Sequence, residues 1–157
     1  MVKKIKLYKN FKILNSHKQS ILLIGNFDGV HLGHQKLFKL AKKFKKKSKI
    51  KIGVLTFEPM PKMFFNKKLK NYRISNLNQK INYFKNYNID FVIVKKFNKK
   101  FSKIKSLDFV RKILYQKLNP KYIFVSNNFR FGYKREGDVK LLKVLEKKYK
   151  YKIIKPR

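Results

Sequence analysis

The sequence predicts an α/β fold in which a doubly wound parallel sheet has helices on both faces. Short apolar runs recur at 21–24, 52–57, 91–94, 122–125 and 151–154. They lack the polar alternation of a half-exposed strand, which indicates strands that are buried on both faces. Segments with helical periodicity lie between them, and this alternation of strands and helices is typical of a doubly wound sheet.

Each predicted helix has apolar positions three or four residues apart. The first stripe consists of Leu37, Leu40, Ala41 and Phe44, with lysines on the other side of the helix. Three further helices are predicted over 77–84 with Ser75 as N-cap, over 110–118 after Ser106, and over 142–149 after Gly137. No repeat, linker or low-complexity tract interrupts this order, so residues 1–157 are expected to form one domain.

Composition excludes several classes of protein. The 157 residues contain no cysteine, so neither a disulfide framework nor a thiolate zinc site is available. No apolar run approaches the ~18 residues of a membrane span, and the N-terminus has no apolar targeting segment. A cytoplasmic protein that does not enter a membrane is expected.

The formal net charge of +36 raises nucleic-acid binding as a first hypothesis. However, lysine supplies almost all of this charge and is spread over every segment, whereas dedicated nucleic-acid sites favour arginine. Drift of the amino-acid composition toward lysine is sufficient to explain this charge. Nonspecific, salt-sensitive adhesion to polyanions is therefore expected, with no specific nucleic-acid partner. A basic nucleic-acid-binding protein on the same scaffold stays as an alternative.

The segment 25–34 reads Gly-Asn-Phe-Asp-Gly-Val-His-Leu-Gly-His and joins a buried strand to a helix. Backbone N–H groups and the helix dipole at such a turn can hold phosphate. His31 and His34 share one helical face, and Gly33 between them lets a phosphate approach the backbone. The turn therefore predicts a site for a nucleotide phosphate, against the plainer interpretation of two exposed imidazoles. No third ligand follows at a zinc-like spacing, so no metal site is predicted, and His17 is expected to be solvated.

Two other strands are followed by unusual segments. Thr56-Phe57-Glu58-Pro59-Met60-Pro61 is stiffened by two prolines and followed by aromatic residues, which suits either a rigid loop over the core or a flat wall for an aromatic ligand. Residues 126–138 combine glycines, amides, arginines and aromatic side chains, which suits a loop that holds a planar phosphorylated ligand, with a plain loop as the alternative. Four of the seven carboxylates lie in these two segments and in 25–34. Their retention in a chain with so few acidic residues suggests that these carboxylates have specific tasks.

These motifs together identify a family resemblance. Gly-Asn-Phe-Asp-Gly-Val-His-Leu-Gly-His, Thr-Phe-Glu-Pro-x-Pro, and Asn-Phe-Arg-Phe-Gly with Arg-Glu-Gly-Asp closely resemble the FMN adenylyltransferase (FAD synthetase) module of bacterial bifunctional riboflavin kinase/FAD synthetases. The resemblance covers essentially the whole chain. It implies a Rossmann-like sheet of the His-x-Gly-His nucleotidyltransferase type, with transfer of AMP from MgATP to FMN giving FAD and pyrophosphate.

The resemblance also implies roles for individual residues. His31 and His34, with the helix N-terminus and Mg²⁺, would stabilise the departing pyrophosphate. The ATP site would be lined by Gly25, Asn26, Phe27, Asp28 and Gly33. The flavin would be flanked by Phe57, Pro59, Pro61, Phe65, Asn128 and Phe131.

The chain departs from the family pattern in three places. Met60 replaces the histidine usual between the two prolines, and Ser126-Asn127-Asn128 replaces a commoner Gly-Asp-Asp. The sequence also stops before the Ser-Ser-Thr-Arg-x-Arg segment that grips ATP phosphates and before the riboflavin kinase domain. Weak adenylyltransferase activity without kinase activity is therefore expected. Another His-x-Gly-His nucleotidyltransferase, with a different acceptor, is the alternative among enzymes.

Overall fold

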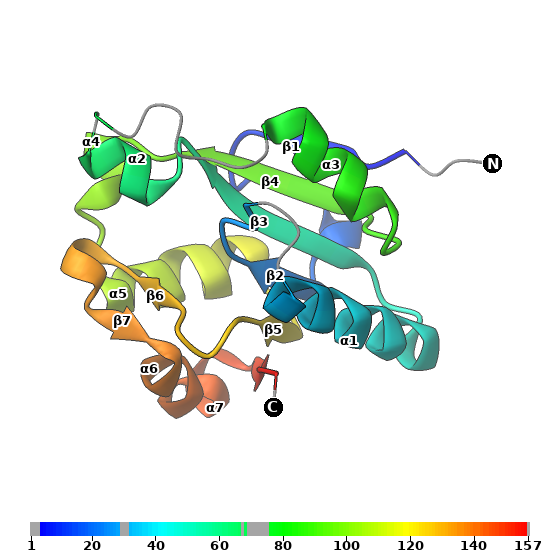
Figure 1. The fold of residues 1–157 in the computed structure, drawn as a ribbon. Coiled ribbons are helices and arrows are strands. Elements are labelled where there is room, and N and C mark those ends of the chain that lie inside the picture. Colours follow the sequence, from blue (N-terminus) through cyan, green and yellow to red (C-terminus); the bar gives the residue numbers. More distant parts are fainter. Residues whose placement is uncertain (1–3, 29–31, 67, 69–75, 157) are drawn as a thin grey trace.

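A computed structural model describes residues 4–28, 32–66, 68 and 76–156. Its centre is a six-stranded sheet in the order β1-β4-β3-β2-β5-β8, in which every neighbouring pair is parallel (Figure 1). The strands are β1 (Lys6–Tyr8), β2 (Ile21–Ile24), β3 (Ile52–Glu58), β4 (Phe91–Lys96), β5 (Tyr122–Phe124) and β8 (Lys152–Ile154). A separate antiparallel pair is formed by β6 (Arg130–Phe131) and β7 (Gly137–Asp138).

The helices fall between the strands, as the alternating pattern predicts. They are η1 (Asn15–His17), α1 (Leu32–Ser48), α2 (Pro61–Phe65), α3 (Leu77–Lys85), α4 (Lys99–Ser102), α5 (Ser106–Asp108), η3 (Phe109–Leu118), η4 (Tyr133–Arg135), α6 (Val139–Val144) and α7 (Glu146–Tyr149). The chain runs from α5 directly into η3, whose backbone hydrogen bonds have the wider π spacing. None of the helices in the described part of the chain combines the length and the apolar character that crossing a bilayer requires.

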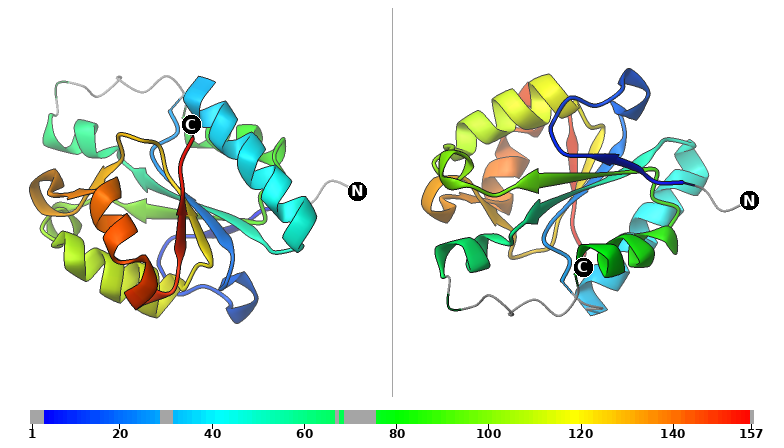
Figure 2. Two further views of the ribbon diagram at one scale, coloured as in Figure 1. Left: turned by 90° about the horizontal axis from the view of Figure 1, so that it is seen from below. Right: turned by 90° about the horizontal axis from the view of Figure 1, so that it is seen from above.

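The sheet is buried on both faces, which confirms the prediction from its apolar runs. Helices α1 and α3 cover one face, and η3 and α6 cover the other (Figure 2). Side chains alternate along β2, so that Ile21 and Leu23 pack under α1 while Leu22 and Ile24 face η3. All four are at most 1% exposed, and burying each such side chain contributes roughly 1.5–3 kcal/mol to stability.

Several details differ from the sequence prediction. The sheet has a sixth parallel strand, β1, which carries lysine beside its apolar residues and lies at an edge. Ser75 lies outside the described residues; the N-cap of α3 is Asn76, whose side chain accepts from the backbone N–H of Gln79 in a capping box. The helix expected over 142–149 is two short helices, α6 and α7, and Asp138 caps the first of them.

The sheet order places β2 between β3 and β5. The chain moves outward from β2 through β3 to β4, and then returns to form β5 on the other side of β2. This reversal is the topological switch point, and ligands of open α/β sheets bind outside the carboxyl ends of the strands there. Leu23 pairs with Phe124, so the segments that follow β2 and β5 begin at nearly the same level.

His17 is buried, and the expectation that it is solvated is wrong. Its ring stacks on Phe91 with centroids 4.5 Å apart, and its Nδ1 lies 2.7 Å from the Tyr8 hydroxyl. Burial is the largest influence on the pKa of His17 and lowers it from the ordinary value of 6.5. The Asp90 carboxylate opposes this shift, while the ammonium groups of Lys51 and Lys6 add to it.

The lowered pKa of His17 makes stability depend on pH. Because the folded state binds this proton less readily than the unfolded state, the contribution is complete above pH 6.5 and is lost as the pH falls from 6.5 through the lowered folded-state pKa. Urea unfolding at pH 7.5 and pH 5.5 should therefore show a larger loss of stability for the wild type than for His17→Gln. Equal losses in the two proteins would contradict the prediction.

Candidate active site

The motif-bearing segments gather at the carboxyl ends of the central strands. Gly25–Asp28 follow β2, Pro59 follows β3, and residues 125–128 follow β5. Since β3, β2 and β5 are adjacent and parallel, these segments leave the sheet at the same edge (Figure 1). The hydroxyl of Thr56, near the end of β3, donates to the carbonyl oxygen of Asn26 at 3.3 Å and so joins the segment after β2 to β3.

The turn between β2 and α1 is held in place by Phe27. Its backbone has a φ of 50°, a left-handed conformation that is unfavourable for an aromatic residue. Its ring is 4% exposed and packs edge-on against His34, with centroids 5.2 Å apart, and against Phe38. A Cβ atom at Gly25 would lie 3.0 Å from this ring. Burial of the ring against His34 and Phe38 thus holds the strained backbone at Phe27 against the first turns of α1.

The predicted phosphate-binding residues lie around this turn. Gly33 and His34 are in the first turn of α1, and His34 is half-buried. Asn26 is exposed and Asp28 is partly exposed, so both are accessible to a ligand. His31 lies outside the described residues. Among the residues that the structure describes, no three histidine or carboxylate side chains gather as a metal-ion site.

The three phenylalanines among the predicted flavin residues, Phe57, Phe65 and Phe131, belong to one row of aromatic rings. Phe65 contacts Phe97 with ring centroids 5.8 Å apart, and Phe97 contacts Phe57 at 6.2 Å. The row continues from Phe57 through Phe101, Phe109 and Phe131 to Phe129, with centroid distances of 5.5, 6.3, 5.4 and 5.6 Å. It therefore connects the loop after β3 to the β6–β7 pair.

Members of this row differ in exposure. Phe57 and Phe131 are each 8% exposed and form part of the core, whereas Phe65 is 66% exposed. Pro59 and Pro61 are partly exposed, and Met60 between them is buried. The segment 56–65 thus has one aromatic ring in the core, that of Phe57 in β3, and one at the surface, that of Phe65 in α2.

A cavity of about 420 Å³ opens beside Phe65, between α2, α4 and η4. Phe64, Phe65 and Tyr133 give it aromatic walls, and Ser102 supplies a hydroxyl. The same cavity is bordered by Lys99, Lys103 and Lys134. Aromatic walls with a few polar or charged groups are the usual lining of a small-molecule site.

The segment 126–138 is anchored to the start of α5. One Glu136 carboxylate oxygen accepts from the backbone N–H of Ser106 at 3.1 Å and from its hydroxyl at 3.3 Å. Gly132 has a φ of 81°, and a Cβ there would lie 2.8 Å from the backbone of Ser106. These contacts hold the β6–β7 pair against α5. Asn128, in the segment between β5 and β6, is exposed.

The comparison with known families decides the classification of this arrangement. The model of the FAD synthetase family matches residues 13–156. The chain belongs to the FAD synthetase family. This agrees with the family suggested by the three motifs and with the α/β sheet that they imply.

Named relatives of this FAD synthetase chain are longer than the chain itself. It is 43% identical to the bifunctional riboflavin kinase/FMN adenylyltransferase of Buchnera aphidicola subsp. Acyrthosiphon pisum, over 94% of this chain and 47% of that protein. It is 33% identical to the enzyme of the same name from Escherichia coli K12, over 85% of this chain and 42% of that protein. The chain thus spans about half the length of these relatives.

Solved structures confirm the fold of the FAD synthetase chain. A protein from Streptococcus pneumoniae described as a macrolide-efflux protein matches 99% of this chain and 50% of its own, with a TM-score of 0.79 and 23% identity. The pantoate-beta-alanine ligase of Francisella tularensis matches 98% of this chain and 67% of its own, with a TM-score of 0.61 and 17% identity.

Not all of the residues that build this candidate site were assigned from the sequence. Phe97 joins Phe65 to Phe57, and Phe101 and Phe109 join Phe57 to Phe131, but none of the three is among the predicted site residues. Their signal in the sequence is the Phe-x-x-x-Phe spacing at 97–101, directly after β4. Such spacing also suits an ordinary helix, so only the fold shows that these rings join the others.

Glu136 is predicted to hold the β6–β7 pair on α5. Replacing it by alanine leaves the backbone N–H of Ser106 without its acceptor, which should destabilise the protein by about 1 kcal/mol, the usual effect of losing a helix N-terminal partner. Glu136→Gln keeps an acceptor oxygen and should retain most of the stability. Urea unfolding of the three proteins measures this, and an alanine variant as stable as the wild type would contradict it.

Proposed function

We propose that this chain catalyses the FMN adenylyltransferase reaction. A phosphate oxygen of FMN attacks the α-phosphorus of ATP and forms the new P–O bond, while the bond from that phosphorus to the oxygen bridging the α- and β-phosphates breaks and pyrophosphate leaves. The observation that carries this proposal is the convergence, at one edge of the sheet, of the segments after β2, β3 and β5 that bear the family's motifs.

The reaction requires little acid–base catalysis by the protein. The attacking phosphate is largely ionised at pH 7, because its second pKa is about 6. Catalysis then depends on holding the two phosphates in line and on stabilising the negative charge of the departing pyrophosphate. His34, His31 and the backbone N–H groups at the start of α1 would supply this stabilisation. Mg²⁺ would enter with ATP as MgATP, largely coordinated by phosphate oxygens and water.

The ATP side of the site would be formed by the β2–α1 turn. Asn26 and Asp28 are accessible there, and Gly33 lies where the helix begins. Phe27 is buried, so its role would be to hold Gly25 and the turn in position rather than to present its ring to the nucleotide. Asn26, Asp28 and Gly33 would therefore contact ATP, whereas Phe27 would shape the backbone around the nucleotide.

The flavin side would be formed by the loop after β3 and the β6–β7 segment. Pro59, Pro61 and Phe65 have accessible surface for an isoalloxazine ring, and Asn128 faces solvent at the end of β5. Phe57 and Phe131 would support this surface from the core. The cavity beside Phe65 has aromatic walls and lysine ammonium groups, which match an aromatic ligand that carries phosphate.

The extent of the domain is also part of the proposal. Residues 1–157 would form the adenylyltransferase domain, corresponding to about half of the relatives' length. Riboflavin kinase activity is stated in the names of those longer proteins and is not proposed for this chain.

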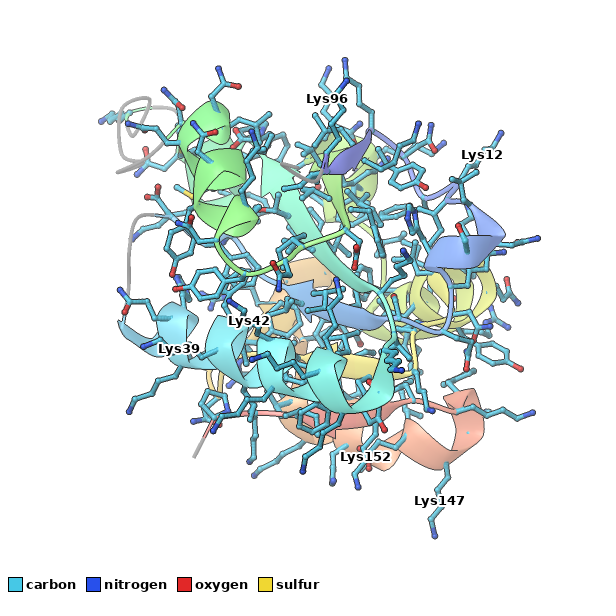
Figure 3. All side chains as sticks on the ribbon, turned by 90° about the vertical axis from the view of Figure 1, so that its right-hand side faces the viewer. Lys12, Lys39, Lys42, Lys96, Lys147 and Lys152 are labelled. Atoms are coloured by element: carbon cyan, nitrogen blue, oxygen red, sulfur yellow. The ribbon has the colours of Figure 1, made fainter. Side chains whose placement is uncertain are left out.

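The high positive charge favours nonspecific adhesion to polyanions as a side effect rather than as a function. Lysine side chains project outward on many sides of the molecule, including Lys12, Lys96, Lys147 and Lys152 in Figure 3. A dedicated nucleic-acid site concentrates charge on one face. Adhesion to such a spread of charge would weaken steeply as the salt concentration rises.

The proposal predicts different effects on catalysis and on binding when His34 is replaced. His34→Ala should lower the rate of FAD formation roughly 10²-fold, as expected for losing one donor that stabilises the transition state. FMN affinity, measured by quenching of flavin fluorescence, should stay close to that of the wild type. Lys36→Ala, an exposed neighbour on α1, serves as the matched control and should change neither quantity.

Two outcomes would contradict the proposal. Unquenched FMN fluorescence at high protein concentration, with ATP still bound, would favour another phosphate acceptor and hence another nucleotidyltransferase. A His34→Ala variant with the wild-type rate would remove this histidine from the proposed mechanism.

A further inference from the structure

Lysine at a core position distinguishes α3 from the other helices of the described chain. Lys80 and Phe84 lie four residues apart on α3 and are the two buried residues of this helix. Lys80 is 1% exposed, and its Nζ lies 3.5 Å from Oε1 of Glu58. Lysine is almost never fully buried unless it is paired, and the surface of this protein accommodates lysine readily. The buried position of Lys80 therefore calls for an explanation other than composition.

Glu58 is the last residue of β3 and precedes Pro59. Side chains alternate along β3, with Val54 packed on the α1–α3 face and Leu55 and Phe57 on the other. This alternation directs the Glu58 side chain toward α3, in agreement with its ion pair. The Glu58 carbonyl oxygen also accepts from the backbone N–H of Phe97 at 3.0 Å. The end of β3 is thus held by β4 through the backbone and by α3 through the Glu58 side chain.

Stability alone is a poor explanation for this ion pair. Removing two charges from water is costly, and well-packed apolar residues in place of a buried ion pair often give equal or greater stability. What an ion pair adds is a defined geometry between the two elements that carry it. Here those elements are α3 and the end of β3, from which Pro59 and Pro61 leave the sheet.

We propose that Lys80 is a positioning residue for the flavin site. Through Glu58 it sets the direction in which the Pro59–Pro61 loop leaves β3, and so the placement of the wall against which the isoalloxazine ring would lie. The inference rests on the proposed function, because the loop matters only if a flavin binds to it. Lys80 does not contact the ligand, since its side chain is fully buried.

A second ion pair, in which the carboxylate is buried and the lysine is partly buried, provides a control. Lys45 of α1 lies 2.8 Å from Asp90, whose carboxylate also accepts from the backbone N–H of Ile52 at 2.9 Å. Ile52 and Asp90 lie at the amino ends of β3 and β4, at the opposite edge of the sheet from the Pro59–Pro61 loop. Loss of this ion pair should affect stability without moving the loop.

The test measures the Kd of FMN by fluorescence quenching and the Kd of ATP by calorimetry, at a temperature where circular dichroism shows each variant to be folded. Lys80→Met should raise the FMN Kd roughly tenfold, because a displaced wall loses its fit to the ring. The ATP Kd should stay within about twofold of wild type, as expected for a distant site. Lys80→Arg should recover most of the FMN affinity, and Lys45→Met should leave it unchanged.

Several results would overturn the inference. The first is a folded Lys80→Met variant whose FMN Kd equals that of the wild type. The second is a Lys80→Met variant in which the Kd values of FMN and ATP rise by the same factor. The third is a Lys45→Met variant whose FMN Kd rises as much as that of Lys80→Met. Should Lys80→Met not fold, Glu58→Gln removes the other charge with little change of shape and must raise the FMN Kd in the same way. If the wild type itself does not bind FMN, the proposed function fails together with the inference. If the wild type binds FMN and the folded variant binds it equally well, only the positioning role of Lys80 fails.

Discussion

Burial of both faces of the parallel sheet is the constraint on which the rest of this structure depends. Because helices cover both faces, a ligand can approach only at an edge of the sheet, and the carboxyl edge carries the connections into α1 and α2. The central position of β2 brings the ends of β3 and β5 to either side of it. Three segments that are far apart in sequence thereby become neighbours around one site.

The carboxylates show how a strongly basic chain maintains this arrangement. Glu58 anchors the end of β3 to α3, Asp90 anchors the starts of β3 and β4 to α1, and Glu136 holds the β6–β7 pair on α5. Asp138 caps α6, and Glu146 accepts from the backbone N–H of Ile153 at 2.6 Å. The expectation that carboxylates at strand ends have specific tasks is confirmed for Glu58, Glu136 and Asp138, whose contacts join or cap neighbouring elements.

The apolar runs, together with the helical periodicity between them, were sufficient to predict most of the fold. The five apolar runs are five of the six strands, because continuous burial leaves an unmistakable pattern in a parallel sheet. β1 was missed because it is a three-residue edge strand with two exposed positions. His17 was placed in solvent because its burial depends on Phe91 and Tyr8, which approach it only in the folded sheet. The motifs predicted where the candidate site lies. They did not predict the rings of Phe101 and Phe109, which join Phe57 to Phe131, or the ion pair between Lys80 and Glu58.

Transfer of an adenylyl group to FMN at this edge of the sheet is the proposed activity on which the roles of the individual residues depend. The most direct measurement incubates the chain with FMN and ATP labelled at the α-phosphate, separates the products, and follows the label and the pyrophosphate together. If the chain is an FMN adenylyltransferase, label enters FAD only when FMN is present, with one pyrophosphate released for each FAD formed. The proposed activity would be contradicted if label passed to a different phosphate monoester under conditions where FMN accepts none.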